Sequence, residues 1–399
     1  MKPIRSQPAG GRQLVGLAAV LVAAVATVGT ATDQVDGRVV RNPHQWPMFK
    51  CRPNRNGRTP RRGPQTAHIA WQNPRITVNG SSPVISRDGT IYIGGWDGSL
   101  YAVDGEGLIK WSYPLGGVIT ASPAIGRDGT VYVAPENGDL HAFEPDGTLK
   151  WTFDLEGYAG ANASPVVTSD GTIYVATDYF YALNPDGTLR WRYDGGYSAA
   201  GPASLGHDDT VYFPARGGNL FAITPTGELK WSVHLTDAAG APTIAGDGTI
   251  YINDYQGRLR ALRPDGTLKW QYKTEGIVVD VPSSPAIGAS GTIYFGGGGE
   301  WEGRGGYFYA VHPNGTLKWK FFSGCDQTSP SVGSDETIFF GNNCGGTMWA
   351  LDAHGAVKWS HKWPSKYLRT APSIGFGDRV YVGLLPTLSG KGALVAFGP

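Results

Sequence analysis

Short apolar runs alternate with turn residues at a regular interval along most of the chain. A clear copy of this pattern spans residues 122–151 and contains three turns, at Asp128-Gly129, Asn137-Gly138 and Asp146-Gly147. Asp-Gly and Asn-Gly supply the positive φ that two-residue hairpins need, and the runs between them are rich in β-branched and aromatic residues. Each copy therefore predicts a four-stranded antiparallel meander, with strands that we name A to D in chain order.

Tryptophan marks strand D of every copy, and the first five of these tryptophans are 40 residues apart. A period near 40 residues is typical of repeat architectures. A four-stranded sheet cannot bury both faces alone, so units of this size usually close radially into a β-propeller. The series consists of Trp71, Trp111, Trp151, Trp191, Trp231, Trp270, Trp319 and Trp359.

Strand A of each copy begins with a small residue followed by proline. The last copy ends near Phe397 without a tryptophan strand, whereas the strand around Trp71 has no strands A to C before it. We therefore predict an all-β, eight-bladed propeller over residues 67–399, in which the N-terminal strand completes the last blade and removes an open sheet edge. The eight starts are Ser82-Pro83, Ser122-Pro123, Ser164-Pro165, Gly201-Pro202, Ala241-Pro242, Ser284-Pro285, Ser329-Pro330 and Ala371-Pro372.

Strand D alternates in polarity, so Leu149, Trp151 and Phe153 should share a face that packs on a neighbouring blade. A basic residue precedes the tryptophan in seven copies. Such a ring could follow a polyanion, but lysine on an outermost strand is also the usual protection against edge pairing. Since 34 basic and 33 acidic side chains leave a net charge of +1, we expect no nucleic-acid partner.

The N-terminus resembles an export signal. Lys2, Arg5 and Arg12 precede an apolar run over residues 14–28, and Ala24-Val25-Ala26 offers a cleavage site. We predict a signal peptide over residues 1–31 and a secreted, periplasmic or cell-envelope protein. An uncleaved membrane anchor is the alternative, since the run is barely long enough to span a bilayer. The polar residues 32–66 predict a linker that packs against the propeller only locally.

Successive turns of a meander alternate between the two ends of a blade. The D-to-A and B-to-C connections therefore share one rim, which we call the variable rim because their sequences differ between copies. Loops on a rigid scaffold are common binding sites. The candidate binding residues on this rim are Trp96, Asp178, Tyr179, Tyr197, Arg216, Asp254, Tyr255, Glu300, Trp301, Asp326, Asn343 and Arg369.

The aromatic candidates could stack on sugar rings or receive a partner peptide, although packing over the blade ends explains them equally well. The acidic candidates lack the fixed short spacing of a metal site, and we assign neither a metal nor a catalytic residue. Cys325 and Cys344 also fall on the variable rim, where a disulfide would suit an exported protein. The role of Cys51 stays open.

The repeat, from its small-residue-Pro start through Asp-Gly-Thr-Ile-Tyr to Asp-Gly-Thr-Leu-Lys-Trp, resembles the pyrroloquinoline quinone (PQQ)-like β-propeller superfamily. Residues 46–49 are similar to the lead-in of such propellers, so the resemblance covers residues 46–399. It implies either a quinone-dependent dehydrogenase or a bare BamB-like docking propeller. The dehydrogenases hold the quinone with Ca²⁺, a catalytic Asp and, in many members, a disulfide between adjacent cysteines. No two cysteines adjoin in this chain, so we expect no cofactor, with PQQ and calcium as the alternative.

Two functions follow from these patterns. The favoured hypothesis is an exported, monomeric, non-catalytic module that binds or scaffolds a protein or glycan at the variable rim. The alternative is an enzyme that uses this rim, either a polysaccharide lyase or hydrolase or a quinone-dependent dehydrogenase.

Overall fold

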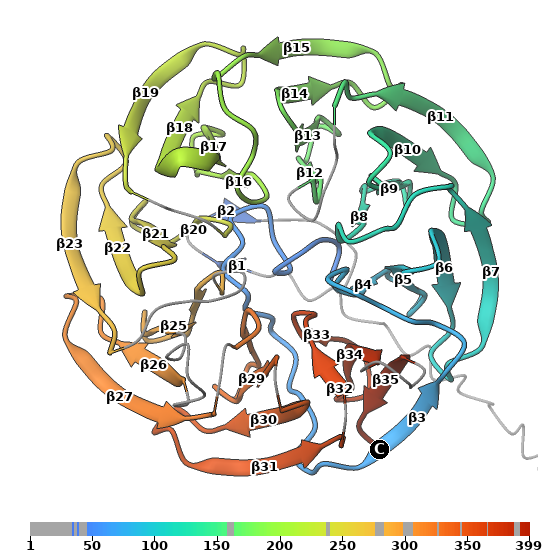
Figure 1. Ribbon diagram of the computed structural model, residues 1–399, viewed down its shortest axis with the longest axis vertical. Helices are drawn as coiled ribbons and strands as arrows, with labels where there is room; N and C mark the ends of the chain where they lie inside the picture. Colours follow the sequence, from blue (N-terminus) through green and yellow to red (C-terminus); the bar gives the residue numbers. More distant parts are fainter. Residues whose placement is uncertain are drawn as a thin grey trace, which may run out of the picture. The chain divides into compact units, whose positions relative to one another are not determined.

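The computed structural model describes residues 34–35, 38–39 and 46–399, except for 158–162, 237–239, 276–282, 298–305, 325–326, 344, 365 and 387–391. The described residues from 46 onward form eight antiparallel sheets around a central axis (Figure 1). The predicted all-β, eight-bladed propeller is therefore confirmed. The predicted signal peptide lies outside the described residues, within which no helix is long and apolar enough to cross a membrane.

The blades follow one another along the chain. Blades 1 to 3 consist of β4 (Val84–Ile85), β5 (Ile91–Gly94), β6 (Ser99–Val103) and β7 (Ile109–Pro114); β8 (Ala124–Ile125), β9 (Val131–Val133), β10 (Asp139–Phe143) and β11 (Leu149–Asp154); and β12 (Val166–Val167), β13 (Ile173–Ala176), β14 (Phe180–Leu183) and β15 (Leu189–Tyr193). Blades 4 and 5 consist of β16 (Ser204–Leu205), β17 (Val211–Ala215), β18 (Asn219–Ile223) and β19 (Leu229–His234); and β20 (Thr243–Ile244), β21 (Ile250–Asn253), β22 (Arg258–Leu262) and β23 (Leu268–Lys273).

The remaining blades keep this plan. Blades 6 and 7 consist of β24 (Ala286–Ile287), β25 (Ile293–Gly296), β26 (Tyr307–Val311) and β27 (Leu317–Phe322); and β28 (Ser331–Val332), β29 (Ile338–Gly341), β30 (Thr347–Leu351) and β31 (Val357–Lys362). Blade 8 contains β33 (Ser373–Ile374), β34 (Val380–Pro386), β35 (Ala393–Phe397) and β3 (Ile69–Asn73), with β32 (Lys366–Leu368) paired to the far end of β34. A 3₁₀ turn, η1 (Arg216–Gly218), and a small hairpin of β1 (Gln34–Val35) and β2 (Arg38–Val39) complete the elements.

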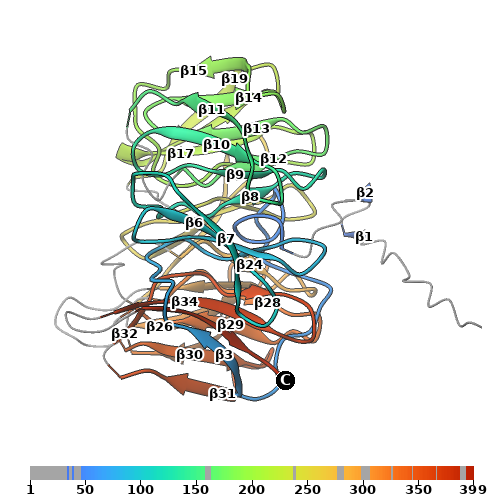
Figure 2. The same cartoon turned by 90° about the vertical axis from the view of Figure 1, so that its right-hand side faces the viewer.

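The N-terminal strand closes the ring as the sequence predicts. β3 pairs antiparallel with β35, with Trp71 opposite Ala396 and Ile69 opposite Phe397. The outer edge of blade 8 is therefore covered, although its two parts are more than 300 residues apart in the sequence. Figure 2 shows the ring from the side, with the A-to-B and C-to-D turns at one end and the variable rim at the other.

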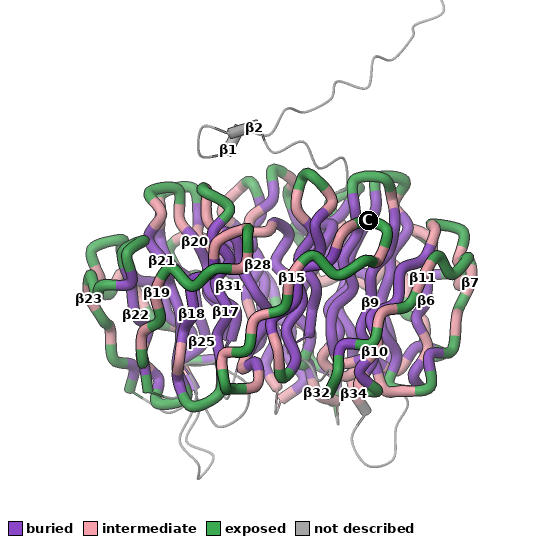
Figure 3. Tube along the Cα trace, turned by 90° about the horizontal axis from the view of Figure 1, so that it is seen from above, coloured by how far each residue is buried: buried purple, intermediate pink, exposed green. Residues whose placement is uncertain are grey.

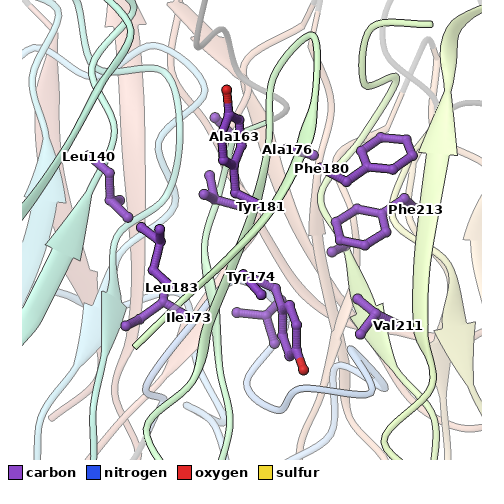
Figure 4. Close-up of a cluster of buried hydrophobic side chains, with 14 of the residues drawn as sticks. Leu140, Ala163, Ile173, Tyr174, Ala176, Phe180, Tyr181, Leu183, Val211 and Phe213 are labelled. Carbon is purple, nitrogen blue, oxygen red and sulfur yellow. The ribbon is translucent and has the colours of Figure 1, made fainter. Parts of the chain in front are cut away.

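Burial increases from the outer strand toward the axis (Figure 3). The blades pack on one another through alternate side chains of their strands (Figure 4). In blade 3, Tyr181 and Leu183 lie on the side of Leu140 from blade 2, while Phe180 stacks on Phe213 from blade 4 with ring centroids 4.3 Å apart. Each sheet thus buries both faces between its neighbours, which is why a single blade cannot fold alone.

The tryptophans of strand D connect each blade to the next. Every indole N–H donates a hydrogen bond to a backbone carbonyl in the following blade, as Trp111 does to Pro145 at 2.9 Å and Trp191 does to Pro225 at 2.9 Å. The predicted packing of the strand D face on a neighbouring blade is confirmed for Trp151 and Phe153, which pack against the buried core. It is wrong for Leu149, which is 39% exposed, because a register shift in the pairing of β10 with β11 interrupts the alternation between Leu149 and Trp151. The pairs are Trp71–Gly105, Trp111–Pro145, Trp151–Pro185, Trp191–Pro225, Trp231–Pro264, Trp270–Pro313, Trp319–Ala353 and Trp359–Pro64.

The hydrogen-bond partner of Trp359 does not lie in a C-to-D turn. Strand D of blade 8 comes from the N-terminal part of the chain, so this blade has no continuous C-to-D turn. The indole of Trp359 therefore donates to Pro64, at 2.8 Å, in the segment that leads into β3. Pro64 thus takes the place of the missing turn.

The basic residues before the tryptophans are paired within their own blades. The Lys230 ammonium, for example, lies 2.9 Å from both Asp208 and Thr210 in the A-to-B turn. Although burial raises the pKa of Asp208, hydrogen bonds from Lys230 and Thr210 lower it to about 2. This pairing accounts for the ring of basic residues without a polyanion.

The glycine of each C-to-D turn lies against the tryptophan of the preceding blade. Gly107 has φ +86°, and a Cβ at this position would lie 2.7 Å from the Trp71 ring. Gly89 has the same φ, yet a Cβ there would have nothing within 4 Å. Substitution of Gly89 tests only the free-energy cost of a positive φ. Substitution of Gly107 adds the cost of contact between the new side chain and the indole.

We predict that Gly107→Ala lowers the free energy of unfolding by about 1–3 kcal/mol more than Gly89→Ala does. Both substitutions share the positive-φ penalty, and only the first forces Trp71 to move. Urea unfolding followed by tryptophan fluorescence measures the difference. Equal destabilisation of the two variants would contradict a structural role for the indole contact.

Candidate binding site at the axis and the variable rim

Residues 46–57, which we call the axial segment, wind around the propeller axis inside the ring and contact most blades. This differs from the predicted linker with only local contacts. Trp46 and Ile85 exchange two backbone hydrogen bonds, of 3.1 and 2.8 Å. In blades 2, 4, 5, 6 and 7, the second residue of strand A donates its N–H to a carbonyl of the axial segment. These bonds are Ile125 to Pro47, Leu205 to Pro53, Ile244 to Asn54, Ile287 to Asn56 and Val332 to Gly57.

The polarity of this segment suits its position. The innermost strands present unpaired backbone N–H and C=O groups toward the axis, and these groups need hydrogen-bond partners once water is excluded. The polar composition of this segment led to the prediction of a linker. In the folded protein the same polar groups fill the central channel and satisfy the innermost strands.

Two cations of the axial segment are completely buried. Lys50 donates from Nζ to the carbonyl of Pro330. Arg55 donates to the carbonyls of Ala203, Phe49 (2.9 Å) and Ser164 (3.2 Å). Within the described residues, neither cation forms an ion pair with a carboxylate. Burial lowers the pKa of Arg55 to about 9, and burial also holds the pKa of Lys50 well below its ordinary value.

A cavity of about 250 Å³ lies on the axis toward the variable rim. Phe49 of the axial segment lines it, and the guanidinium carbon of Arg55 is 5.4 Å from the centroid of this ring. The walls come largely from the residues that precede or begin strand A. They include Ser82, Ser122, Ser164, Gly201, Ser284, Ser329 and Ala371, together with Leu368 and Arg369.

The cavity gathers two of the predicted rim residues, Asn343 and Arg369. The Arg369 Nε donates to the Asn343 Oδ1 at 2.9 Å. Trp96 and Tyr197 are each 48% exposed and Tyr255 is 41% exposed, but they belong to different blades and do not line the cavity. Arg216 is exposed in η1.

Other predicted residues are held within the scaffold. Asp254 is fully buried between Arg258 (2.7 Å) and Arg260 (2.8 Å), so it is a structural ion-pair partner rather than an exposed ligand. Tyr179 packs beneath the Arg192 guanidinium at 4.5 Å, and the exposed Asp178 accepts a hydrogen bond of 2.6 Å from Ser198. Glu300, Trp301, Asp326 and the cysteines 325 and 344 lie outside the described residues.

A protein-family model described as "Outer membrane protein assembly factor BamB" matches residues 58–180, 96–223 and 177–322. The chain belongs to this BamB family of PQQ-like propellers. This confirms the predicted PQQ-like propeller. A search of curated proteins gives no match.

Solved structures of the same fold include both functional groups that the sequence resemblance implies. Quinohemoprotein alcohol dehydrogenase from Comamonas testosteroni is 15% identical, with a TM-score of 0.73 over 90% of this chain and 81% of that chain. BamB from Moraxella catarrhalis is 17% identical, with a TM-score of 0.63 over 81% and 98%. A europium-containing methanol dehydrogenase is 14% identical, with a TM-score of 0.71 over 90% and 99%. At these identities the likeness shows the fold alone.

The cavity of this BamB-family propeller differs from the calcium-quinone site that the resemblance implies. The described lining residues include no Asp or Glu, and the described parts of the chain contain no cluster of His, Cys, Asp and Glu that could hold a metal ion. Ca²⁺ is bound mainly by carboxylate and carbonyl oxygens. These described lining residues therefore do not fit the calcium ion that accompanies the quinone in such a site.

The axial cavity itself was missed by the sequence analysis. The feature of the sequence that could have indicated the cavity is a serine before the proline of strand A. It occurs in five of the eight copies, as Ser82, Ser122, Ser164, Ser284 and Ser329. The pattern indicates the start of strand A, and only the closed ring brings these serines to one site.

We predict that Lys50→Met changes the pH dependence of stability in this protein. Because the pKa of Lys50 is lowered in the folded state, the folded state binds fewer protons at Lys50 than the unfolded state does. The free energy of unfolding of the wild type therefore increases as the pH rises, up to about the ordinary lysine pKa of 10.4. The free energy of unfolding of the wild type should therefore increase relative to that of Lys50→Met as the pH rises from about 7 to 9.5. Urea unfolding at several pH values measures it, with the exposed Lys362→Met as the control for net charge. A constant difference would contradict a lowered pKa of Lys50 in the folded state.

Proposed function

We propose that the chain is an exported, non-catalytic scaffold that binds a protein partner through its variable rim. The observation that carries this proposal is the set of exposed aromatic side chains, Trp96, Tyr197 and Tyr255, on otherwise buried and rigid blades. Aromatic side chains that combine apolar area with a polar group dominate many protein interfaces.

The connections that carry these aromatics are held in place by backbone hydrogen bonds. Trp96 donates its N–H to the Thr77 carbonyl at 2.8 Å, and Arg216 donates to the Ser198 carbonyl, beside Tyr197, at 2.8 Å. A surface ordered before binding loses less conformational entropy when a partner docks. The rim therefore suits protein recognition better than a flexible loop surface would.

Family membership supports the same proposal. The matching model is described as an outer membrane protein assembly factor, a name that refers to the assembly of outer membrane proteins. We extend this role to the present chain as an extracytoplasmic, monomeric scaffold. The predicted signal peptide over residues 1–31 agrees with this location, and a glycan that stacks on the same aromatics is the competing ligand.

The double variant Trp96→Ala/Tyr255→Ala should weaken binding to the partner at least tenfold, since each ring removes apolar contact area from the interface. The control, Leu108→Ala/Leu268→Ala, removes exposed apolar side chains from strand D or the turn before it, away from the variable rim. The partner is first identified by photo-crosslinking from positions 96 and 255 in envelope preparations, and its affinity is then measured with purified components. A glycan array tests the competing ligand.

Equal affinity of the rim variant and the wild type would contradict the choice of surface. Binding to a glycan with loss in the same variant would replace the protein partner by a carbohydrate and keep the rim.

Calcium should add nothing to any effect of PQQ on the melting temperature, because the described cavity lining offers no carboxylate for it. Thermal unfolding with the quinone alone, with Ca²⁺ alone and with both measures this. A calcium-dependent stabilisation, accompanied by dye reduction with an alcohol or sugar, would favour the dehydrogenase instead.

A further inference from the structure

The serines of the axial cavity form two chains of hydrogen bonds between blades. Ser82 Oγ accepts from the backbone N–H of Ala371 at 2.9 Å, Ser122 Oγ accepts from Ser82 at 2.8 Å, and Ser164 Oγ accepts from Ser122 at 2.9 Å. On the opposite side, Ser284 Oγ accepts from Ala241 and Ser329 Oγ accepts from Ser284, both at 2.9 Å. Each hydroxyl oxygen is therefore fixed in position by a backbone donor.

The hydrogens of these five hydroxyls have no acceptor among the described residues. Ser82, Ser122, Ser164 and Ser284 are at most 4% exposed, and all five serines line the cavity. A buried hydroxyl that donates to nothing costs free energy, so the arrangement favours an occupant that accepts hydrogen bonds.

The charge around the cavity has the sign that complements such an acceptor. Arg55 lies behind the Phe49 ring and donates to the Ser164 carbonyl, while Lys50 donates to the Pro330 carbonyl next to Ser329. Both side chains are fully buried. Arg55, with a pKa of about 9, stays cationic at neutral pH and its field is weakly screened, whereas burial holds the pKa of Lys50 well below its ordinary value, so Lys50 contributes a hydrogen-bond donor rather than a full charge. Glu136 does not line the cavity, but it accepts a hydrogen bond of 2.8 Å from the hydroxyl of Thr120, which does, and its charge opposes that of Arg55.

We infer that the axial cavity binds a carboxylate, in addition to the proposed partner surface on the rim. A carboxylate offers two acceptor oxygens with about four lone-pair sites and no donor, which matches a cavity lined by hydroxyl donors. Phe49 and Leu368 supply apolar contact for a short hydrocarbon stem. A volume of about 250 Å³ suits a small organic acid or the terminal carboxylate of a peptide.

Other ligand chemistries fit the described lining less well. A metal cation would need anionic oxygen ligands, which this lining lacks. The hydroxyl groups of a neutral sugar are donors that need acceptors. The serines of the cavity offer hydrogen-bond donors rather than acceptors. Inorganic phosphate shares the charge but makes no use of the apolar contacts.

The test measures binding of butyrate and succinate to the full chain by calorimetry and thermal unfolding, with butyramide as the neutral analogue of butyrate. We expect both acids to bind and to raise the melting temperature, and butyramide to bind at least tenfold more weakly. Ser122→Ala/Ser284→Ala should weaken acid binding at least tenfold, whereas the exposed control Ser232→Ala should leave it unchanged. Glu136→Gln should strengthen binding, because it removes the opposing charge.

Two peptides distinguish the source of the carboxylate. A peptide that ends in a free carboxylate and its C-terminal amide are compared with the free acids; preference for the free-acid peptide assigns a chain terminus, and binding of the small acids alone assigns a metabolite. Equal affinity for butyrate and butyramide, phosphate binding without carboxylate binding, or full binding by the double serine variant would overturn the inference. Trp96→Ala/Tyr255→Ala should retain carboxylate binding, so failure of the rim proposal and failure of this inference are distinguishable.

Discussion

The hydrogen bond from the indole of each strand D tryptophan to a carbonyl of the next blade is the interaction on which the ring depends. It fixes the distance between neighbouring blades, and it requires a glycine where the turn meets the indole face, as at Gly107. The Trp359 bond to Pro64 extends the same rule across the joint between the two chain ends. Because every blade uses this one geometry, the scaffold is uniform and the differences between blades are confined to the variable rim.

The axial segment turns this uniform ring into an asymmetric molecule. Eight similar blades leave a polar channel, and a single segment of irregular turns satisfies the inner strands of most of them. The same segment brings Lys50 and Arg55 to the axis, where the surrounding carbonyls accept hydrogen bonds from both side chains. Stability and recognition are therefore coupled, since the residues that fill the channel also set the electrostatic potential of the cavity.

Sequence periodicity was sufficient for the blades and insufficient for the axis. The Trp series, the Asp-Gly turns and the unpaired strand around Trp71 predict eight blades and their closure, because these are local patterns that repeat. The axial segment occurs once, and many of its partners are hundreds of residues away in the sequence. A repeating sequence pattern therefore cannot predict its position. Asp254 illustrates the same limit at the rim: its position in a connection suggests exposure, whereas Arg258 and Arg260 bury it. The serines were visible only as strand markers, because their convergence requires the closed ring.

Closure of blade 8 by β3 has a consequence for the order in which the protein assembles. The two parts of this blade are separated by almost the whole propeller, so their pairing carries the largest loop-closure entropy and is the slowest class of contact to form. A chain that crosses a membrane from its N-terminus delivers β3 first and β35 last. For the export that we propose, the propeller would stay an open arc, with β3 unprotected, until translocation is complete. An interrupted translocation product would expose that edge to chaperones and proteases, so ring closure would also serve as a check that the whole chain has arrived.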